Sequence, residues 1–290
     1  MIRAPHITAL AAACALTLGA SSAAAGPWVK GPGEVYAKVA GSAFQGTSLW
    51  DVDANQLDAP FVYSNQALTT YAEVGLLDGL ALGLNLPVIV GRNVVEERTT
   101  YEQWGAGDLD VFAQGQLFEA SGCALSATLA VRVPLYDGVI SDGTEPGAVG
   151  TSGPERFIPA LGDGSIDVTP TASAGCSLYP VPVWFGVEVG PNLRTQGFGQ
   201  GVRYAADVGV WVWPEVVALS ARVDGVQRVT DDNARPTKSF VSVSGGATVR
   251  VWEGLGLELN GGFVPWGAFV ARGWQVGVGV SYSGALIPGG

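Results

Sequence analysis

Segments in which apolar and polar side chains alternate run through most of this chain. Between residues 80 and 90, for example, leucine and valine fill every even position, whereas alanine, glycine, asparagine and proline fill most odd ones. Because successive side chains of a β-strand point to opposite faces, this period of two predicts strands. The 42 glycines and 17 prolines favour the same class, since both residues disfavour helices. We predict an all-β chain with twelve strands, at residues 34–45, 67–77, 80–90, 107–119, 124–136, 164–178, 183–193, 201–213, 216–228, 239–252, 255–264 and 272–283.

The connections between the predicted strands alternate in length. Tight turns are predicted at residues 78–79, 121–122, 179–182, 214–215 and 253–254. Longer loops separate them, at residues 46–66, 91–106, 137–163, 194–200, 229–238 and 265–271. Outer-membrane barrels have short periplasmic turns and longer outside loops, so every second connection is short. The strands are also long enough to cross a bilayer, which takes roughly 9–11 tilted residues.

Charged side chains gather on one face of the predicted strands. If the more apolar face meets lipid, nine acidic and five basic residues fall on the other face. Eleven of them are our candidates for facing a lumen: Glu73, Asp108, Asp110, Arg132, Asp167, Glu188, Arg203, Asp207, Arg222, Arg250 and Glu258, with Glu34, Lys38 and Asp224 beside them. A charge on the lipid face would cost a few kcal/mol near the midplane. The pattern predicts a transmembrane antiparallel up-and-down β-barrel of about twelve strands, although a half-buried soluble sheet also alternates.

The first 25 residues have the layout of a signal peptide. Arg3 precedes an apolar stretch at residues 10–18, and three alanines at 23–25 precede Gly26. We therefore expect residues 1–25 to be cleaved and residues 26–290 to form a single barrel domain in the outer membrane of a Gram-negative bacterium. Cleavage would remove His6, the only histidine. Without an imidazole, histidine-dependent catalysis is excluded, and we expect no enzyme, no cofactor and no metal.

The net charge and the cysteines bear on partners and on covalent structure. A net charge of −11 would repel a nucleic-acid backbone, so nucleic acid is not an expected partner. After removal of the signal segment, Cys123 and Cys176 remain. They fall at the turn ends of neighbouring antiparallel strands, within the spacing that a disulfide needs. In an oxidising compartment, we predict that they are bonded.

Two loops carry possible function. Asp51, Asp53, Asn55 and Asp58 alternate like the start of a calcium loop, but Gln56 and Val62 replace its expected glycine and glutamate. A solvated acidic loop is therefore the default there. The loop at 137–163 is the longest, and it can fold inward to narrow a pore, form a lid or serve as an adhesion surface. The sequence leaves those three alternatives open.

Several motifs resemble a known family. They are Trp28 to Lys30, Gly33 to Tyr36, Tyr71 to Leu76, Leu80 to Pro87 and Gly105 to Asp110, with an echo of the last at Gly162 to Val168. These motifs resemble the outer-membrane transporter-like proteins of the meta-pathway of phenol degradation family. The resemblance implies a barrel that passes small, often hydrophobic or aromatic, molecules. For a barrel of this kind we expect outer-membrane lipid and lipopolysaccharide, a small-molecule solute and the barrel assembly machinery as partners. Outer-membrane barrels usually end on an aromatic residue, and this sequence departs from that pattern, because residues 283–290 follow the nearest candidate, Tyr282.

Three functions follow from these patterns. The first is a passive channel whose lumen, with more acids than bases, tolerates cations or neutral solutes. In the simplest reading of that lumen, Arg132, Arg203, Arg222 and Arg250 pair with carboxylates and brace the wall. The second is a structural or adhesion barrel with a plugged lumen. The third is a soluble secreted β-sandwich that binds a ligand.

Overall fold

The chain forms one continuous antiparallel sheet of thirteen strands. The computed structural model describes residues 26–95, 99–136, 158–230 and 237–285. The strands are β1 (Glu34–Trp50), β2 (Gln56–Leu77), β3 (Leu80–Val95), β4 (Thr99–Ala106), β5 (Asp108–Ala120), β6 (Cys123–Pro134), β7 (Asp167–Ser177), β8 (Val183–Arg194), β9 (Gly201–Trp213), β10 (Val217–Arg228), β11 (Ser239–Trp252), β12 (Leu255–Ala268) and β13 (Val270–Ala285). The predicted signal peptide, residues 1–25, and most of the 137–163 loop lie outside the described residues.

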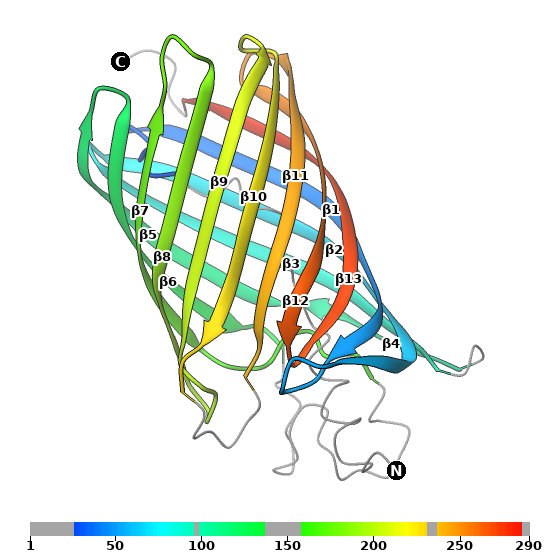
Figure 1. Cartoon of the computed structure of the whole chain (residues 1–290). Helices are drawn as coiled ribbons and strands as arrows, with labels where there is room; N and C mark the ends of the chain where they lie inside the picture. Colours follow the sequence, from blue (N-terminus) through cyan, green and yellow to red (C-terminus); the bar gives the residue numbers. More distant parts are fainter. Residues whose placement is uncertain (1–25, 96–98, 137–157, 231–236, 286–290) are drawn as a thin grey trace.

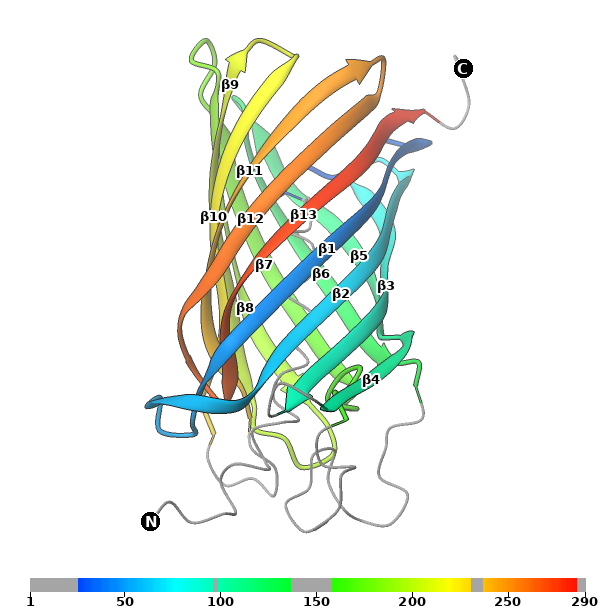
Figure 2. The ribbon, with the colours of Figure 1, turned by 90° about the vertical axis from the view of Figure 1, so that its right-hand side faces the viewer.

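The sheet closes on itself as a barrel. Neighbouring strands in the chain pair in order, β1 pairs with β13, and the β2–β3 pairing completes the ring. The β4 and β5 strands both pair with β3 and are separated only by Gly107, whose amide donates to the carbonyl of Pro87 at 2.8 Å. Together they form one interrupted strand of the wall. The barrel therefore has twelve strands, as the sequence predicted (Figures 1 and 2).

The polarity of the barrel is reversed relative to a soluble protein. Valine and leucine side chains cover the outside, and Val278 is 61% exposed. Polar side chains are buried inside, where Glu73 is 4% exposed and Gln114 is fully covered. This distribution suits a wall between lipid outside and polar groups inside. In the described part of the chain, no helix has the length and apolar character needed to span a membrane.

The two ends of the barrel differ. The five tight connections lie at one end, here the turn end, which is the upper end of Figures 1 and 2 and also holds the start of β1 and the end of β13. Glycines in the left-handed region close some of these turns, such as Gly79 with φ +73° and Gly254 with φ +74°. The opposite end is here the loop end. The five predicted turns therefore share one end, as expected, but the opposite end also has a tight connection, because only Phe269 separates β12 from β13.

Several predicted loops were wrong in extent. Residues 46–50 and 56–66, predicted as loop, extend β1 and β2, and residues 91–95 and 99–106 form a hairpin of β3 and β4. The predicted loop at 265–271 also belongs mostly to β12 and β13. The wall at the loop end is thus taller than the alternating pattern indicates, because these extensions pair outside the apolar band and carry no strong alternation.

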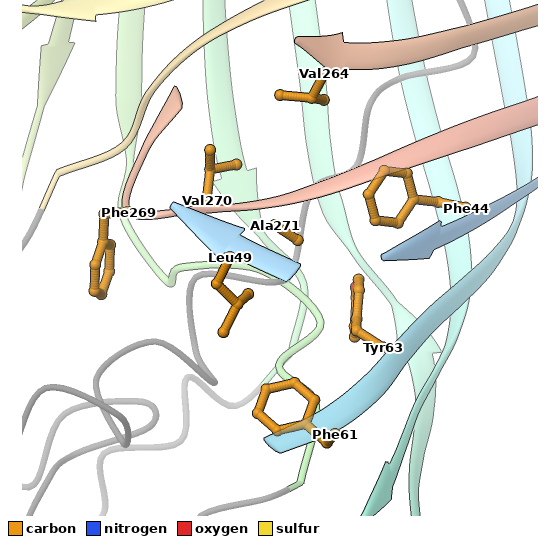
Figure 3. Close-up of a cluster of buried hydrophobic side chains, with 8 residues drawn as sticks. All are labelled: Phe44, Leu49, Phe61, Tyr63, Val264, Phe269, Val270 and Ala271. Carbon is orange, nitrogen blue, oxygen red and sulfur yellow. The ribbon is translucent and has the colours of Figure 1, made fainter. Parts of the chain in front are cut away.

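An apolar cluster closes one side of the interior at the loop end. It consists of Phe44, Leu49, Phe61, Tyr63, Val264, Phe269, Val270 and Ala271 (Figure 3). The Phe44 and Tyr63 rings lie 5.9 Å apart between centroids. Burial of a large apolar side chain stabilises a fold by about 1.5–3 kcal/mol. The cluster therefore holds β1, β2 and the β12–β13 turn together where ladder pairing between β12 and β13 has ended at Phe263 and Trp274.

The predicted disulfide is present. Cys123 and Cys176 are direct partners in the β6–β7 register, and their Cα atoms are 4.0 Å apart. The bond ties the two strands at the turn end, at the base of the hairpin that carries the longest loop.

Candidate functional site

The candidate site is the barrel lumen, which contains a cavity of about 270 Å³. Six acidic and five basic side chains line the cavity: Asp108, Asp110, Asp163, Asp167, Glu188 and Asp224, with Arg132, Arg194, Arg203, Arg222 and Lys238. Threonine, serine and asparagine side chains from several strands fill much of the remaining polar surface, and Phe44, Tyr71, Phe112 and Phe240 add aromatic surface. The cavity therefore offers polar and apolar contacts at once.

The segment before β1 crosses the turn end of the lumen. Gln114 donates through Nε2 to the Gly26 carbonyl at 2.9 Å, and the Val29 amide donates to Oε1 of Gln116 at 3.0 Å. The same segment passes close to β2, because a β-carbon on Gly75 would overlap the backbone of Gly31. Residues 26–31 are thus held by β2 and β5 and narrow this end of the lumen.

The described end of the longest loop enters the lumen from the other side. Pro159 and Leu161 are buried behind the β3–β4 hairpin, against Gly91 and Gly105 respectively. The hydroxyl of Tyr136 accepts from the Gly164 amide at 2.9 Å. Of the alternatives for this loop, residues 158–166 follow the inward one and narrow the loop end of the lumen.

A charge cluster holds this inward segment to the wall. Arg194, at the end of β8, forms salt bridges with Asp163 and with Asp167, the latter at 3.2 Å. Lys238 lies 3.7 Å from Asp163, and the Arg194 guanidinium stacks over Phe198 at 4.3 Å. Burial alone would raise the pKa of Asp163, but Lys238 and Arg194 hold that pKa below its ordinary value. Asp163 is therefore a carboxylate at neutral pH.

A second hydrogen bond supports the same segment from β5. The Tyr136 hydroxyl, which accepts from Gly164, donates to Oδ1 of Asp108 at 2.8 Å. A β-carbon on Gly162 would overlap that hydroxyl. Glycine at this position therefore allows the segment to pass close to Tyr136.

Ion pairs brace the barrel wall, as the simplest reading of the sequence predicted. Arg132 contacts Asp110 through two nitrogens, at 2.8 and 3.3 Å. Arg222 lies 3.7 Å from both Asp207 and Asp224. Two of the four predicted arginines differ. Arg203 has no salt bridge within 4 Å among the described residues, and the partner of Arg250 is the exposed turn residue Glu215.

The predicted lumen residues separate into two groups. Seven line the cavity: Asp108, Asp110, Arg132, Asp167, Glu188, Arg203 and Arg222. Four do not, namely Glu73, Asp207, Arg250 and Glu258. Glu258 pairs with Lys38 nearer the turn end, Asp207 pairs with Arg222, and the Tyr71 hydroxyl donates to Glu73 at 3.2 Å. Arg250 lies at the turn end, 3.8 Å from exposed Glu215 and over the Trp211 ring at 5.6 Å.

Sequence reasoning missed three charged residues of the cavity. Asp163, Arg194 and Lys238 fall in predicted loops or at a strand end, where alternation gives no information about direction. The echo of residues 105–111 at 162–168 gives no signal for Asp163, because Asp163 corresponds to Ala106, whereas Asp167 corresponds to Asp110. With these residues included, the cavity has six acids and five bases, so its excess of acids is smaller than the nine to five expected for the inner face of the strands.

The acidic tip between β1 and β2 has a structural role. Asp51 accepts through Oδ1 from the amides of Asp53 and Asn55, at 2.9 and 2.7 Å. Its other oxygen accepts from the Asn55 side chain at 3.1 Å. The described residues contain no group of three or more acidic, cysteine or histidine side chains placed to hold a metal. Asp51 therefore stabilises a turn.

Comparisons with known proteins place the fold but not the family. No protein-family model matches the chain, and no curated protein matches it significantly. Among solved structures, the chain is similar to the COG4313 outer membrane channel from Pseudomonas putida F1, with a TM-score of 0.69 and 11% identity, covering 88% of this chain and 97% of that one. The fold is that of an outer-membrane β-barrel. The beta domain of the Bordetella autotransporter BrkA is also similar, with a TM-score of 0.51 and 13% identity, covering 87% of this chain and 100% of that one.

Proposed function

We propose that this barrel is an outer-membrane channel for the passive passage of small solutes. The observation that carries the proposal is the cavity in the lumen, lined by charged and polar groups, inside a barrel with an apolar outer surface. Polar groups along a pore replace part of the water that a solute sheds on entry. A lining in which most charges are paired performs this task without trapping ions strongly.

Each end of the lumen is narrowed by a different segment of the chain. Residues 26–31 narrow the turn end, which would face the periplasm, and residues 158–166 narrow the loop end. A solute entering from outside would pass the Arg194 cluster, cross the cavity and leave beside Gln114. The size limit of passage would be set by these two segments, because the barrel wall itself is continuous.

The same two segments favour a second candidate, a structural or adhesion barrel with a plugged lumen. In that case the segments would be permanent packing, and the surface at the loop end would carry the function. The two candidates differ in solute flux alone, since both predict the same fold and the same membrane.

Solute flux in liposomes tests the proposal. Purified protein, first verified as a folded barrel by faster gel mobility of the unboiled sample, is reconstituted and challenged with neutral and charged solutes of increasing size. We expect flux of the smallest solutes with a sharp size limit. Absence of flux for every solute would reject the channel and leave the plugged barrel.

The sequence also suggests how the protein is exported and inserted, and which solutes it passes. We propose export by cleavage after residue 25, residence in the outer membrane in contact with lipopolysaccharide, and insertion by the barrel assembly machinery. The family resemblance further suggests hydrophobic or aromatic solutes, and Phe44, Phe112 and Phe240 provide compatible surface in the cavity. Amino-terminal sequencing of the purified protein would test the cleavage site.

A further inference from the structure

Two charged side chains of opposite sign face the cavity without a hydrogen bond or a salt bridge in the described part of the chain. Glu188 on β8 and Arg203 on β9 both line it, and within the described ranges neither forms a hydrogen bond or an ion pair within 4 Å. Charges farther away still act on them, since Arg203 attracts Asp110 and Asp224, and Glu188 repels Asp224. Other charges of the cavity are engaged, such as Arg132 with Asp110. A charged group inside a protein is normally paired. These two therefore remain available to a ligand.

The register places the two charges on neighbouring strands. Glu188 lies opposite Ala205, and Arg203 lies opposite Gly190, so the charged residues are diagonal neighbours. Diagonal neighbours on adjacent strands lie roughly 7–8 Å apart, with their β-carbons somewhat closer. Between β8 and β9, the residues directly opposite the two charges, Ala205 and Gly190, have no hydrogen-bonding side chain. On their other sides lie Ser173 and Val226.

Aromatic side chains line the other side of the same cavity. Phe44 belongs to β1 and Tyr71 to β2, and the strand order places β1 and β2 across the barrel from β8 and β9. The Tyr71 ring also stacks with Phe112 of β5, at 5.8 Å between centroids. The cavity thus has a polar side with two unpaired charges and an aromatic side suited to an apolar group.

The signs of the two charges restrict the ligand. A simple carboxylate would be attracted by Arg203 and repelled by Glu188, whereas a simple amine would meet the opposite balance. A molecule that carries both charges on one carbon can satisfy both residues. The cavity, at about 270 Å³, lies near the small end of ligand pockets and suits a small molecule.

We propose that the lumen binds a small zwitterion with an apolar side group, such as an aromatic amino acid. Arg203 binds the carboxylate of this solute, Glu188 binds its ammonium group, and the aromatic side of the cavity contacts its apolar group. The proposal rests on the proposed channel in one respect only, which is that the bound molecule is a transported solute.

Three matched probes test the site by equilibrium binding to detergent-purified barrel, measured by titration calorimetry. Phenylalanine carries both charges, 3-phenylpropanoate lacks the ammonium group, and 2-phenylethylamine lacks the carboxylate. We expect phenylalanine to bind about tenfold or more tightly than either of the others, because each charge-assisted hydrogen bond adds at least that factor.

Substitutions assign each charge. R203Q should abolish the preference for phenylalanine over 2-phenylethylamine, and E188Q should abolish the preference over 3-phenylpropanoate. R203K retains the charge and should restore part of the binding. R250Q is the matched control, because Arg250 faces the same interior but lies outside the cavity. Heat-dependent gel mobility verifies that each variant is a folded barrel.

The outcomes separate this inference from the proposed function. Equal affinities of the three probes, or a phenylalanine preference that R203Q and E188Q leave unchanged, would overturn the zwitterion site even if liposome flux is normal. The expected binding pattern without any flux would support the site and reject the channel instead.

Discussion

At the scale of single residues, Arg194 attaches the inward segment, residues 158–166, to the barrel wall. It is 5% exposed and contacts Asp163, Asp167 and Ser165, all from the segment that leads from the inward loop into β7. Removal of one partner from a buried ion pair costs about 3–5 kcal/mol, because a buried charge is left alone. Arg194 therefore determines whether residues 158–166 stay inside the barrel.

We expect R194Q to release this segment. The variant should admit larger solutes in liposome assays and lose its unboiled gel mobility at a lower temperature than the unmodified protein. Arg92 provides the control, because its pair with Glu102 is about half exposed on both sides and such pairs contribute about 0–1 kcal/mol. An R194Q barrel with an unchanged size limit would show that the segment is held without Arg194.

Asp163 makes the same attachment dependent on pH in a defined direction. Burial opposes its charge, but Lys238 and Arg194 lower its pKa below the ordinary value of about 3.9. A lowered pKa in the folded state means that this carboxylate stabilises the attachment above the ordinary pKa, and the contribution disappears as the pH falls through the lowered value. The attachment should therefore survive mild acid.

We expect the Asp163 contribution to the solute size limit to remain constant from pH 7 to about 4.5. The measurement is liposome flux against pH for the unmodified protein and for D163N, which lacks the titrating group. D163N should admit larger solutes throughout this range. Convergence of the two proteins near pH 6 would contradict a lowered pKa for Asp163.

At the scale of elements, the segment at residues 26–31 makes one close backbone contact with β2, in addition to its hydrogen bonds with β5. A β-carbon on Gly75 would overlap the backbone of Gly31, whereas one on Gly41 of β1 meets open space. Valine at position 75 must therefore displace the segment or the strand. We expect G75V to raise the solute flux, with G41V unchanged. Equal flux in G75V, with a folded barrel by gel mobility, would show that the segment does not limit passage.

The sequence predicted the face to which each side chain points better than it predicted where each strand begins and ends. The period of two identified the membrane-crossing part of each strand, because lipid and lumen impose opposite preferences on alternate residues. Beyond the apolar band, residues 99–103 of β4 read Thr-Thr-Tyr-Glu-Gln and show no such contrast, yet they pair with β3. The pairing of these residues depends on the neighbouring strand β3, and the sequence of residues 99–103 alone does not indicate it.

Lumen residues were likewise predictable where they lie in regular strands and not where they lie in irregular segments. Arg132 and Asp110 were predictable as lumen residues because they lie inside regular strands, and their cross-strand register brings them together. Lys238 and Asp163 belong to irregular segments, and their meeting depends on how two distant loops fold into the lumen. The lack of a partner for Arg203 was equally hidden, since alternation gives the direction of a side chain and not its neighbours.

At the scale of the whole molecule, the lining determines how the barrel treats charge. The strand pattern alone gave nine acids and five bases on the inner face, which favours cations clearly. The cavity itself holds six acids and five bases, and most of them are paired, because Arg194 at the end of β8 and Lys238 just before β11 add two bases that the strand pattern did not count. Paired charges produce a weak net field in a pore.

We therefore expect only slight cation selectivity. In a planar bilayer with a potassium chloride gradient, the reversal potential should lie close to zero, on the side of potassium permeation. E188Q removes an unpaired acid and should shift the potential toward chloride, whereas R203Q removes the unpaired base and should shift it toward potassium. Arg250, outside the cavity, should have little influence when changed to glutamine. Strong cation selectivity in the unmodified protein would mean that the inner-face acids near the turn end, and not the balanced cavity, control ion passage.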